Sequence, residues 1–196
     1  MKIISFYTDD WEYPRHAKRL RAECGSLGID NYIVELPSTG SYLKNTCLKP
    51  RFILDCLMKF KEPVLWIDVD ASILDYPHLA GILEVDFAAR MMAEDRARTW
   101  HVGTMWFNYT QAMVIFLESW IENTGKLSDE SALEKTWSDN GWMLTTHSLP
   151  PEYFYIIRYR HHMIPEGTII AHRISSGESK KNELPGAIEY AKNGGW

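Results

Sequence analysis

The feature that most constrains the fold is the apolar run Val64-Leu65-Trp66-Ile67, which is followed at once by Asp68-Val69-Asp70. Such a run is typical of a strand buried on both faces, as in parallel sheets that are covered by helices. The two aspartates would then lie at the carboxyl edge of the sheet, where open α/β folds hold their ligands. Aspartate pairs with this spacing arise by chance about as often as not in a chain of this composition, so the position of the pair carries the inference.

Patterns upstream of this run predict a β-α-β-α-β order. Residues 1–7 and 32–36 are short apolar segments with the features of strands, and residues 13–27 between them have helical spacing. A flexible loop over residues 38–45 leads to a second helix that begins near Pro50. The order predicts an α/β fold, with a mostly parallel, twisted central sheet and helices on both faces.

The patterns downstream are shorter. We expect strands over residues 86–91, 105–108 and 168–171, the last ending at His172, and a helix over residues 111–123. A further short helix is expected over residues 131–137, where Ser131 and Glu134 fit a capping box.

The length of 196 residues predicts one domain. We divide it into a nucleotide- and metal-binding half (residues 1–110), an acceptor half (residues 111–176) and a polar tail (residues 177–196) that we expect to be mobile. Aromatic residues make up 13% of the chain, which favours a sugar or nucleotide ligand because rings stack on both. The net charge of −5 argues against a surface made for coating nucleic acid.

The three cysteines, Cys24, Cys47 and Cys56, are odd in number and form no C-x-x-C pair. They indicate buried thiols in a reducing compartment rather than a disulfide framework. No apolar stretch approaches the length of a membrane span, and the first strand is too short for a signal peptide. We therefore expect a cytoplasmic protein, bacterial or virus-encoded in a host cytoplasm, and leave its oligomeric state open.

Ordered blocks along residues 3–176 resemble one family. The blocks are Phe6-Tyr7-Thr8, Lys49-Pro50-Arg51-Phe52-Ile53, Leu65-Trp66-Ile67-Asp68-Val69-Asp70, Gly103-Thr104 through Thr110, Asp129-Glu130, Tyr153-Phe154-Tyr155 and Ile170-Ala171-His172. Their order and spacing resemble the GT-A-fold glycosyltransferases, the nucleotide-diphospho-sugar transferases that share an Asp-x-Asp motif. Val102 stands where the family often has serine, and Asp129-Glu130 where it often has Asp-Gln, so the third metal ligand and the stereochemistry stay open.

The resemblance implies a metal-dependent transfer of sugar from a nucleoside-diphosphate sugar, most simply a UDP-sugar, to a hydroxyl acceptor. Asp70 would bind Mn²⁺ or Mg²⁺ directly, Asp68 would bind the metal or the ribose, and His172 would be a third ligand. Each of the three could instead serve the local structure, as a loop cap or a packed histidine.

The other site residues implied by the resemblance surround the donor and the acceptor. Tyr7 and Thr8 would contact the nucleoside, Lys49 and Arg51 the phosphates, and Gly103 and Thr104 the transferred sugar. Asn108 would either bind the sugar or brace its loop. Asp129 and Glu130 are the catalytic candidates: one would deprotonate the acceptor in an inverting reaction, or orient the sugar in a retaining one.

Other functions remain open. A sugar-nucleotide nucleotidyltransferase would want a glycine-rich basic loop after the first strand, where this chain has Thr8-Asp9-Asp10. An inactive nucleotide- or carbohydrate-binding module and a metal-dependent phosphohydrolase are further alternatives. The acceptor could be a glycan, a protein, a small molecule or a hydroxymethylated DNA base. The basic candidates for DNA are Arg15, His16, Lys18, Arg19 and Arg21, and a second cluster of Arg158, Arg160, His161 and His162.

Overall fold

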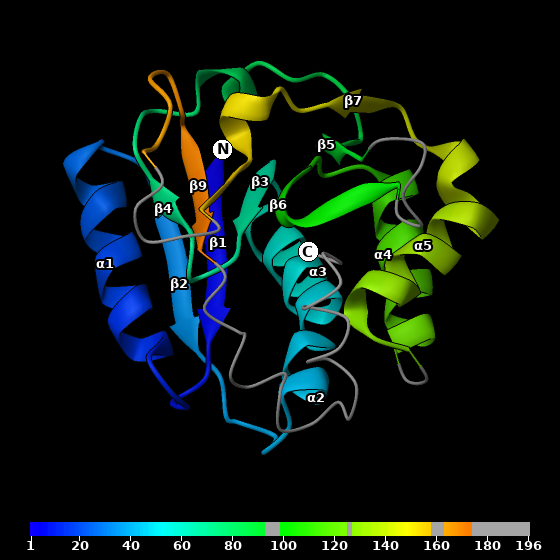
Figure 1. The fold of residues 1–196 in the computed structure, drawn as a ribbon. Helices are drawn as coiled ribbons and strands as arrows, with labels where there is room; N and C mark the ends of the chain where they lie inside the picture. The colour runs from blue at the N-terminus through cyan, green and yellow to red at the C-terminus, as the bar shows by residue number, and fades with distance from the viewer. Residues whose placement is uncertain (93–98, 125–126, 158–162, 174–196) are drawn as a thin grey trace.

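The computed structural model describes residues 1–92, 99–124, 127–157 and 163–173 (Figure 1). The strands are β1 (Lys2–Tyr7), β2 (Asn31–Glu35), β3 (Val64–Ile67), β4 (Ser72–Ile73), β5 (Phe87–Met91), β6 (Trp100–Phe107), β7 (Thr146–Ser148), β8 (Tyr155–Ile157) and β9 (Ile170–Arg173). The α-helices are α1 (Tyr13–Ser26), α2 (Tyr42–Thr46), α3 (Lys49–Phe60), α4 (Gln111–Thr124) and α5 (Asp129–Asn140). Short 3-10 helices are η1 (His78–Gly81), η2 (Gly141–Met143) and η3 (Pro151–Tyr153).

The central sheet has six strands in the order β2-β1-β3-β6-β5-β7. β1 pairs in parallel with β2 and β3, and β5 pairs in parallel with β7. β6 is antiparallel to both of its neighbours, β3 and β5. The predicted mostly parallel α/β sheet is confirmed, with β6 as its reversed strand.

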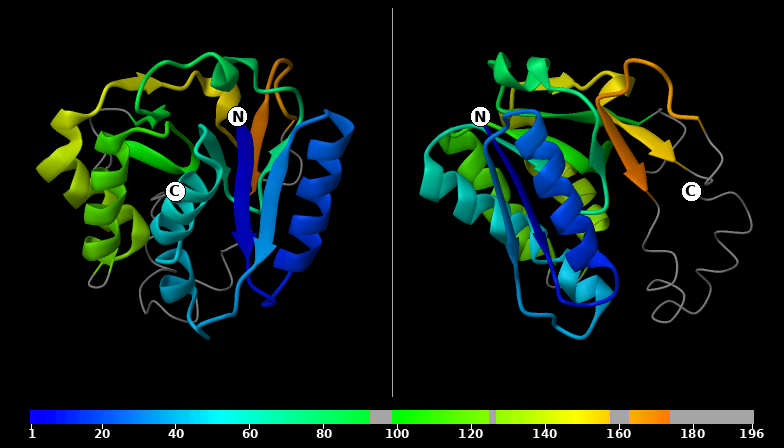
Figure 2. Two further views of the ribbon diagram at one scale, coloured as in Figure 1. Left: turned by 180° about the vertical axis from the view of Figure 1, so that it is seen from behind. Right: turned by 90° about the vertical axis from the view of Figure 1, so that its left-hand side faces the viewer.

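Helices cover both faces of this sheet, as the side view in Figure 2 shows: α1 lies on one face, and α3, α4 and α5 lie on the other. Alternate residues of the strands pack toward the two faces because side chains alternate along a strand. The face of α3–α5 takes Ile4, Val64, Trp66, Met105 and Phe107, and the face of α1 takes Ile3, Leu65, Ile67 and Trp106. This double burial explains why β3 is apolar at every position.

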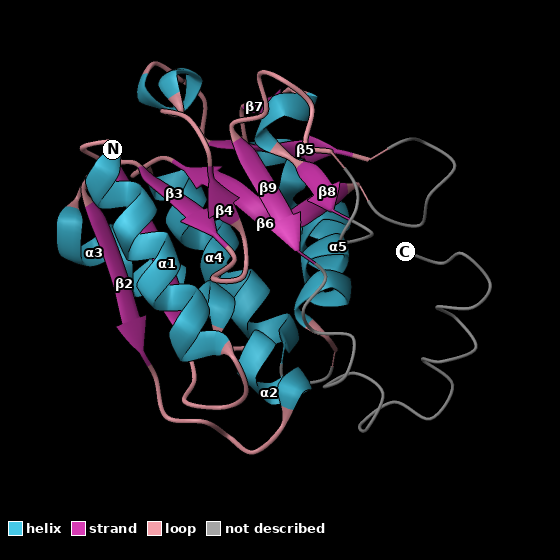
Figure 3. Ribbon diagram, turned by 60° about the vertical axis from the view of Figure 1, so that its left-hand side comes forward, coloured by secondary structure: helices cyan, strands magenta, loops and turns pink. Residues whose placement is uncertain are grey.

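A second, three-stranded sheet has the order β4-β9-β8 and lies over the α1 side of the central sheet (Figure 3). β4 is antiparallel to β9, with Ser72 opposite Ala171, and β8 is parallel to β9. The link from β3 to β4 is short, so the residues between them join the two sheets.

Most predicted elements are confirmed, including the first three strands, α1 and α4. The expected loop over residues 38–45 is wrong at its end, where α2 begins at Tyr42 after its N-cap, Ser41. The expected capping box is also wrong. The N-cap of α5 is Ser128, which accepts from the Ser131 amide, and Glu134 instead accepts from the amide of Thr99 before β6. β4, β7 and β8 were not expected because each has only two or three residues.

Within the described ranges, no helix combines the length and the apolar character that crossing a membrane requires. The predicted polar tail, residues 177–196, lies outside those ranges.

Candidate functional site

The buried strand β3 delivers Asp68 and Asp70 to the carboxyl edge of the central sheet. The Asp68 amide donates to Gly103 O of β6 at 2.8 Å, which continues the ladder for one residue beyond the strand. The chain then turns, and the Ala71 amide donates to Asp68 O at 2.9 Å. Asp70 therefore stands in a tight turn immediately beside the sheet edge.

Lys49 joins this edge from the first turn of α3, and its side chain is buried between two carboxylates. Its Nζ lies 2.9 Å from Asp129 Oδ2 and 3.2 Å from Asp68 Oδ1, and it also donates to Val102 O at 3.4 Å. The Trp66 indole donates to the same Asp68 Oδ1 at 3.0 Å. These contacts bring together residues from α3, α5 and two strands.

The ion pairs change the protonation chemistry of the group. Burial alone would lower the pKa of Lys49, but Asp129 and Asp68 outweigh it and raise that pKa, so Lys49 stays charged. Burial, aided by the nearby Asp129 charge, raises the pKa of Asp68 in spite of Lys49. The alternative of a solvated charge at the start of the helix is therefore wrong for Lys49, which is a buried counter-ion, and its predicted contact with the phosphates stays a prediction.

His172 approaches the edge from the second sheet. Its Nε2 shares a 2.7 Å hydrogen bond with Thr104 Oγ1 of β6, and its ring packs 4.9 Å from the ring centroid of Phe154. Burial, together with the positive charge of Lys49, lowers the pKa of His172 to about 3. The imidazole is thus neutral at physiological pH, which is the form that binds metals.

Gly103 is needed because its neighbour leaves no room for a side chain. A Cβ at this position would lie 2.7 Å from Cε1 and 2.9 Å from Nδ1 of His172. The glycine therefore allows the His172 ring to lie directly against the β6 backbone, one residue from the Thr104 hydrogen bond.

The three predicted metal ligands approach the same edge. Because Ser72 pairs with Ala171 in antiparallel strands, the turn carrying Asp70 runs beside the end of β9 that carries His172. Among the described residues, no three side chains of histidine, cysteine, aspartate or glutamate lie close enough to enclose a metal ion. Magnesium and manganese sites that phosphate oxygens and water complete need only one or two protein carboxylates. A cation at this edge would therefore need ligands from outside the described protein residues.

A cleft of about 620 Å³ lies at the ends of β1 and β2. Its lining residues are Asp9, Asp10, Glu35, Leu36, Pro37, Ser38 and Gly40. Tyr7 and Thr8 lead into this cleft from β1; Thr8 is buried, and Tyr7 O accepts from the Leu36 amide at 2.8 Å. The volume is within the range of small-molecule sites.

Trp11 is a residue that the sequence reasoning did not single out. It follows the cleft residues Asp9 and Asp10, it is 58% exposed, and its φ is +57°, in the left-handed region that a bulky residue rarely adopts. A strained, exposed aromatic residue at the rim of a cleft is suited to stacking on a ring. The available signal was a tryptophan in a polar turn directly after a buried strand.

Asn108 lies away from the carboxylates around Lys49, and Arg51 and Glu130 are less buried than Lys49. Asn108 follows β6, whose antiparallel direction puts it at the opposite end of β3 from Asp68, and it braces the loop by donating to Val85 O at 3.1 Å. The sugar-binding alternative for Asn108 is thus disfavoured, and the loop-bracing alternative holds. Arg51 is exposed on α3, and Glu130 is half-buried in the first turn of α5.

Two arginines of α1, the basic helix considered for DNA binding, donate hydrogen bonds to backbone carbonyls of the protein itself. Arg19 donates to Asp70 O and Ala71 O, and Arg21 donates to Ile33 O. His16 is buried. The first basic cluster is therefore less suited to DNA than its sequence indicated. The second cluster, Arg158, Arg160, His161 and His162, lies outside the described residues.

Comparison with solved structures identifies the fold. A glycosyltransferase involved in the glycosylation of the major capsid of PBCV-1 superposes with a TM-score of 0.66 at 15% identity, over 92% of this chain and 97% of that one. The chain has a glycosyltransferase fold. The glycosyltransferase GlyE of Streptococcus pneumoniae has a TM-score of 0.60 at 15% identity, over 93% of this chain and 56% of its own. The galactosyltransferase LgtC, solved with donor and acceptor sugar analogues, has a TM-score of 0.53 at 13% identity, over 90% and 88%.

No protein-family model and no curated protein sequence matches the chain. The expected GT-A-like fold is confirmed by these structures, and the identities are too low to transfer an activity.

Proposed function

We propose that this protein is a glycosyltransferase that moves a sugar from a nucleoside-diphosphate sugar, most simply a UDP-sugar, to a hydroxyl acceptor. The observation that carries the proposal is that Asp68, ion-paired with buried Lys49, and the turn of Asp70 lie at an edge of a glycosyltransferase fold that β9 with His172 also reaches. Solved proteins with this fold are named as glycosyltransferases, one of them with donor and acceptor analogues bound.

We assign a divalent cation, Mn²⁺ or Mg²⁺, to Asp70 and His172, with Asp68 beside them. The carboxylates of Asp68 and Asp129 face the ammonium group of Lys49, and Asp70 adds a third carboxylate in the adjoining turn, so this edge is rich in oxygen ligands for a cation. When bound, the cation supplies Lewis acidity to the departing diphosphate. Neutral His172 adds a nitrogen donor, which favours Mn²⁺ over Mg²⁺.

The residues around the cation have separate tasks in this proposal. The cleft at β1 and β2 receives the nucleoside, with Tyr7 and Thr8 just before its lining residues Asp9 and Asp10 in the chain and Trp11 just after them. Gly103 and Thr104 serve the sugar side of the site through His172, whose ring packs against Gly103 and bonds to the Thr104 hydroxyl. Arg51, which is exposed in the first turn of α3, is assigned to the phosphates, because a guanidinium pairs well with phosphate oxygens.

Asp129 and Glu130, at the start of α5, have different roles in this proposal. Asp129 is buried and ion-paired with Lys49, so it holds Lys49 and through it Asp68. Glu130 is less buried, and it is the better candidate to orient the acceptor hydroxyl or take its proton. Glu130→Gln should therefore reduce turnover more than it changes donor affinity.

The experiment is thermal unfolding with UDP, GDP, ADP and CMP, each with and without Mn²⁺, followed by an assay of UDP-sugar hydrolysis. A rise in Tm confined to one nucleotide with metal, absent in Asp70→Ala, supports the proposal and names the donor class. Asp55→Ala, which removes an exposed carboxylate from α3, is the matched control and should behave as wild type. The absence of a shift with every pair would refute the proposal and favour a carbohydrate-binding module.

A further inference from the structure

A side chain of α1 forms hydrogen bonds with the backbone of the turn that carries Asp70. Arg19 Nη2 donates to Asp70 O at 2.8 Å and to Ala71 O at 2.9 Å, although more than 50 residues separate α1 from this turn. Both bonds go to main-chain carbonyls, so they fix the path of the turn.

Glu23, one helical turn after Arg19, binds the other end of the same turn and also pairs with Arg19. Its Oε2 accepts from the Ile73 amide at 2.9 Å, and its Oε1 lies 3.5 Å from Arg19 Nε. β4 is an edge strand of the second sheet, so its outward backbone groups need partners from elsewhere. The two side chains therefore bind the backbone over residues 70–73 at both ends of the turn.

The charges of the two side chains also fit a site for a cation. A guanidinium alone beside Asp70 would repel a divalent cation bound to that carboxylate. Glu23 pairs with Arg19 and cancels most of this repulsion, so the pair can orient the turn without opposing the cation.

We infer that Arg19 and Glu23 are positioning residues that hold Asp70 in the geometry for binding a cation and the donor diphosphate. The inference rests on the proposed function, because it assigns the pair to the metal site proposed there. Partners that orient metal ligands in this way typically change metal affinity by about 10- to 100-fold when they are removed. Loss of Arg19 should weaken the binding of metal with nucleotide by a factor in that range.

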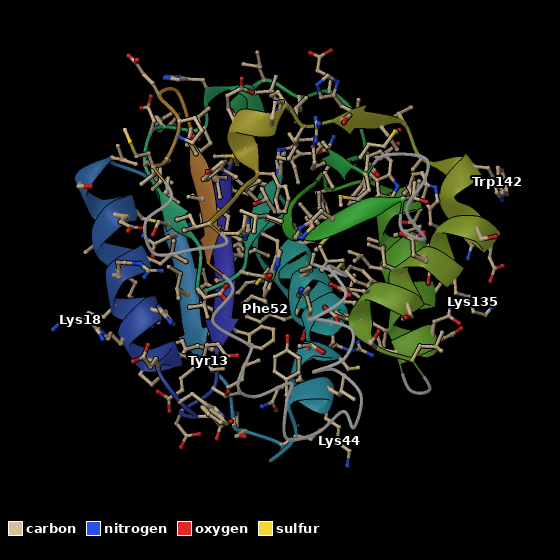
Figure 4. All side chains as sticks on the ribbon, viewed as in Figure 1. Tyr13, Lys18, Lys44, Phe52, Lys135 and Trp142 are labelled. Atoms are coloured by element: carbon tan, nitrogen blue, oxygen red, sulfur yellow. The ribbon has the colours of Figure 1, made fainter. Side chains whose placement is uncertain are left out.

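The test measures UDP binding by isothermal titration calorimetry with and without Mn²⁺ for wild type, Arg19→Gln and Arg19→Lys. Arg19→Gln should raise the Kd of UDP about 10- to 100-fold in Mn²⁺ and leave the Kd without metal unchanged. Arg19→Lys should recover part of the loss, since one ammonium group can still donate to both carbonyls. Lys18→Gln is the control, because exposed Lys18 points away from the body of the protein on the same helix (Figure 4).

A second readout does not depend on ligand. Amide hydrogen exchange, followed on peptides that cover residues 64–75, should be faster in Arg19→Gln than in wild type. The inference is overturned if Arg19→Gln binds UDP with Mn²⁺ as wild type does, or if it loses affinity equally with and without metal. Failure of the proposed function is seen separately, as wild type that binds no nucleotide with metal.

Discussion

Replacing Lys49 with methionine is the sharpest test of how the site is built. Methionine keeps the length of the apolar stem, so the change removes mainly the ammonium group. Lys49 is only 5% exposed, and its charge is the counter-ion of both Asp68 and Asp129 at 3.2 and 2.9 Å. Without it, two carboxylates remain close together with little access to water.

The cost follows from that burial. Breaking a buried ion pair by removing one partner typically costs about 3–5 kcal/mol, because the other charge is left uncompensated. Asp129 is almost fully buried, whereas the side chain of Asp68 is 32% exposed, so water partly relieves Asp68 and the estimate stays within that range. For a chain of this length each kcal/mol lowers Tm by about 2–4 °C, so a fall of roughly 6–20 °C is expected.

The assay is urea unfolding in a double-mutant cycle with Asp129→Asn, performed in chelator so that metal does not contribute. The double variant should be more stable than the sum of the single losses predicts, by about 1–3 kcal/mol, since Asp129→Asn removes the charge that Lys49 compensates. Lys59→Met, which alters an exposed lysine of the same helix, should cost far less. Additive losses, or a Lys49→Met variant as stable as Lys59→Met, would refute the buried counter-ion role.

Three further predictions concern packing, charge and capping. Gly103→Ala should cost about 1–3 kcal/mol in denaturant unfolding, because the new Cβ displaces the ring of His172; a wild-type value would contradict this packing. Burial alone would raise the pKa of Asp86, but hydrogen bonds from two threonines lower it. Its stabilisation is present above the unfolded-state pKa and is lost as pH falls through the lower folded-state pKa. Asp86→Asn should therefore cost about 1–2 kcal/mol at pH 7, and its Tm gap from wild type should close in acid rather than stay constant. Ser128→Ala should cost about 1 kcal/mol in thermal unfolding, and Ser131→Ala less; the reverse order would restore the capping box.

The first half of the fold was predictable because its signals are local and continuous. β3 is apolar at every position, since α1 packs on one face of the sheet and α3 on the other. The spacing within α1 and α3 and the prolines at their first turns were equally visible in the sequence. Those patterns predict a parallel sheet covered by helices on both faces, and few other folds are compatible with them.

Strand direction and short strands were harder to predict. The expected strand over residues 105–108 overlaps β6 only from Met105 to Phe107, since β6 begins at Trp100, and nothing in its composition indicates that it runs antiparallel to β3. That direction sends Asn108 to the far end of the sheet, while Gly103 and Thr104 lie at the site. β4 and β8 are stabilised mainly by pairing with β9, and such pairings leave no periodicity in two or three residues.

The residues of the site were predictable in type more than in role. Lys49 was expected because of its position before a helix, yet its partner Asp129 lies 80 residues further along the chain, and only the packing of α5 brings the two together. The contact of Arg19 with the turn after Asp68 is likewise invisible locally, because an amphipathic helix normally exposes its arginines.

The placement of Asp70 follows from the short connection between two sheets. At one end Asp68 is bonded to Gly103 O of the central sheet, and at the other Ile73 is paired with Ile170 of the second sheet. A turn whose two ends are fixed in different sheets has few conformations left, and Arg19 restricts them further through the carbonyl of Asp70 itself. The second sheet also supplies His172, so a shift of β9 would move this proposed ligand and one anchor of the turn together. A site of this kind is preorganised as a unit, and the proposed cation ligands should gain or lose cation affinity together rather than one at a time.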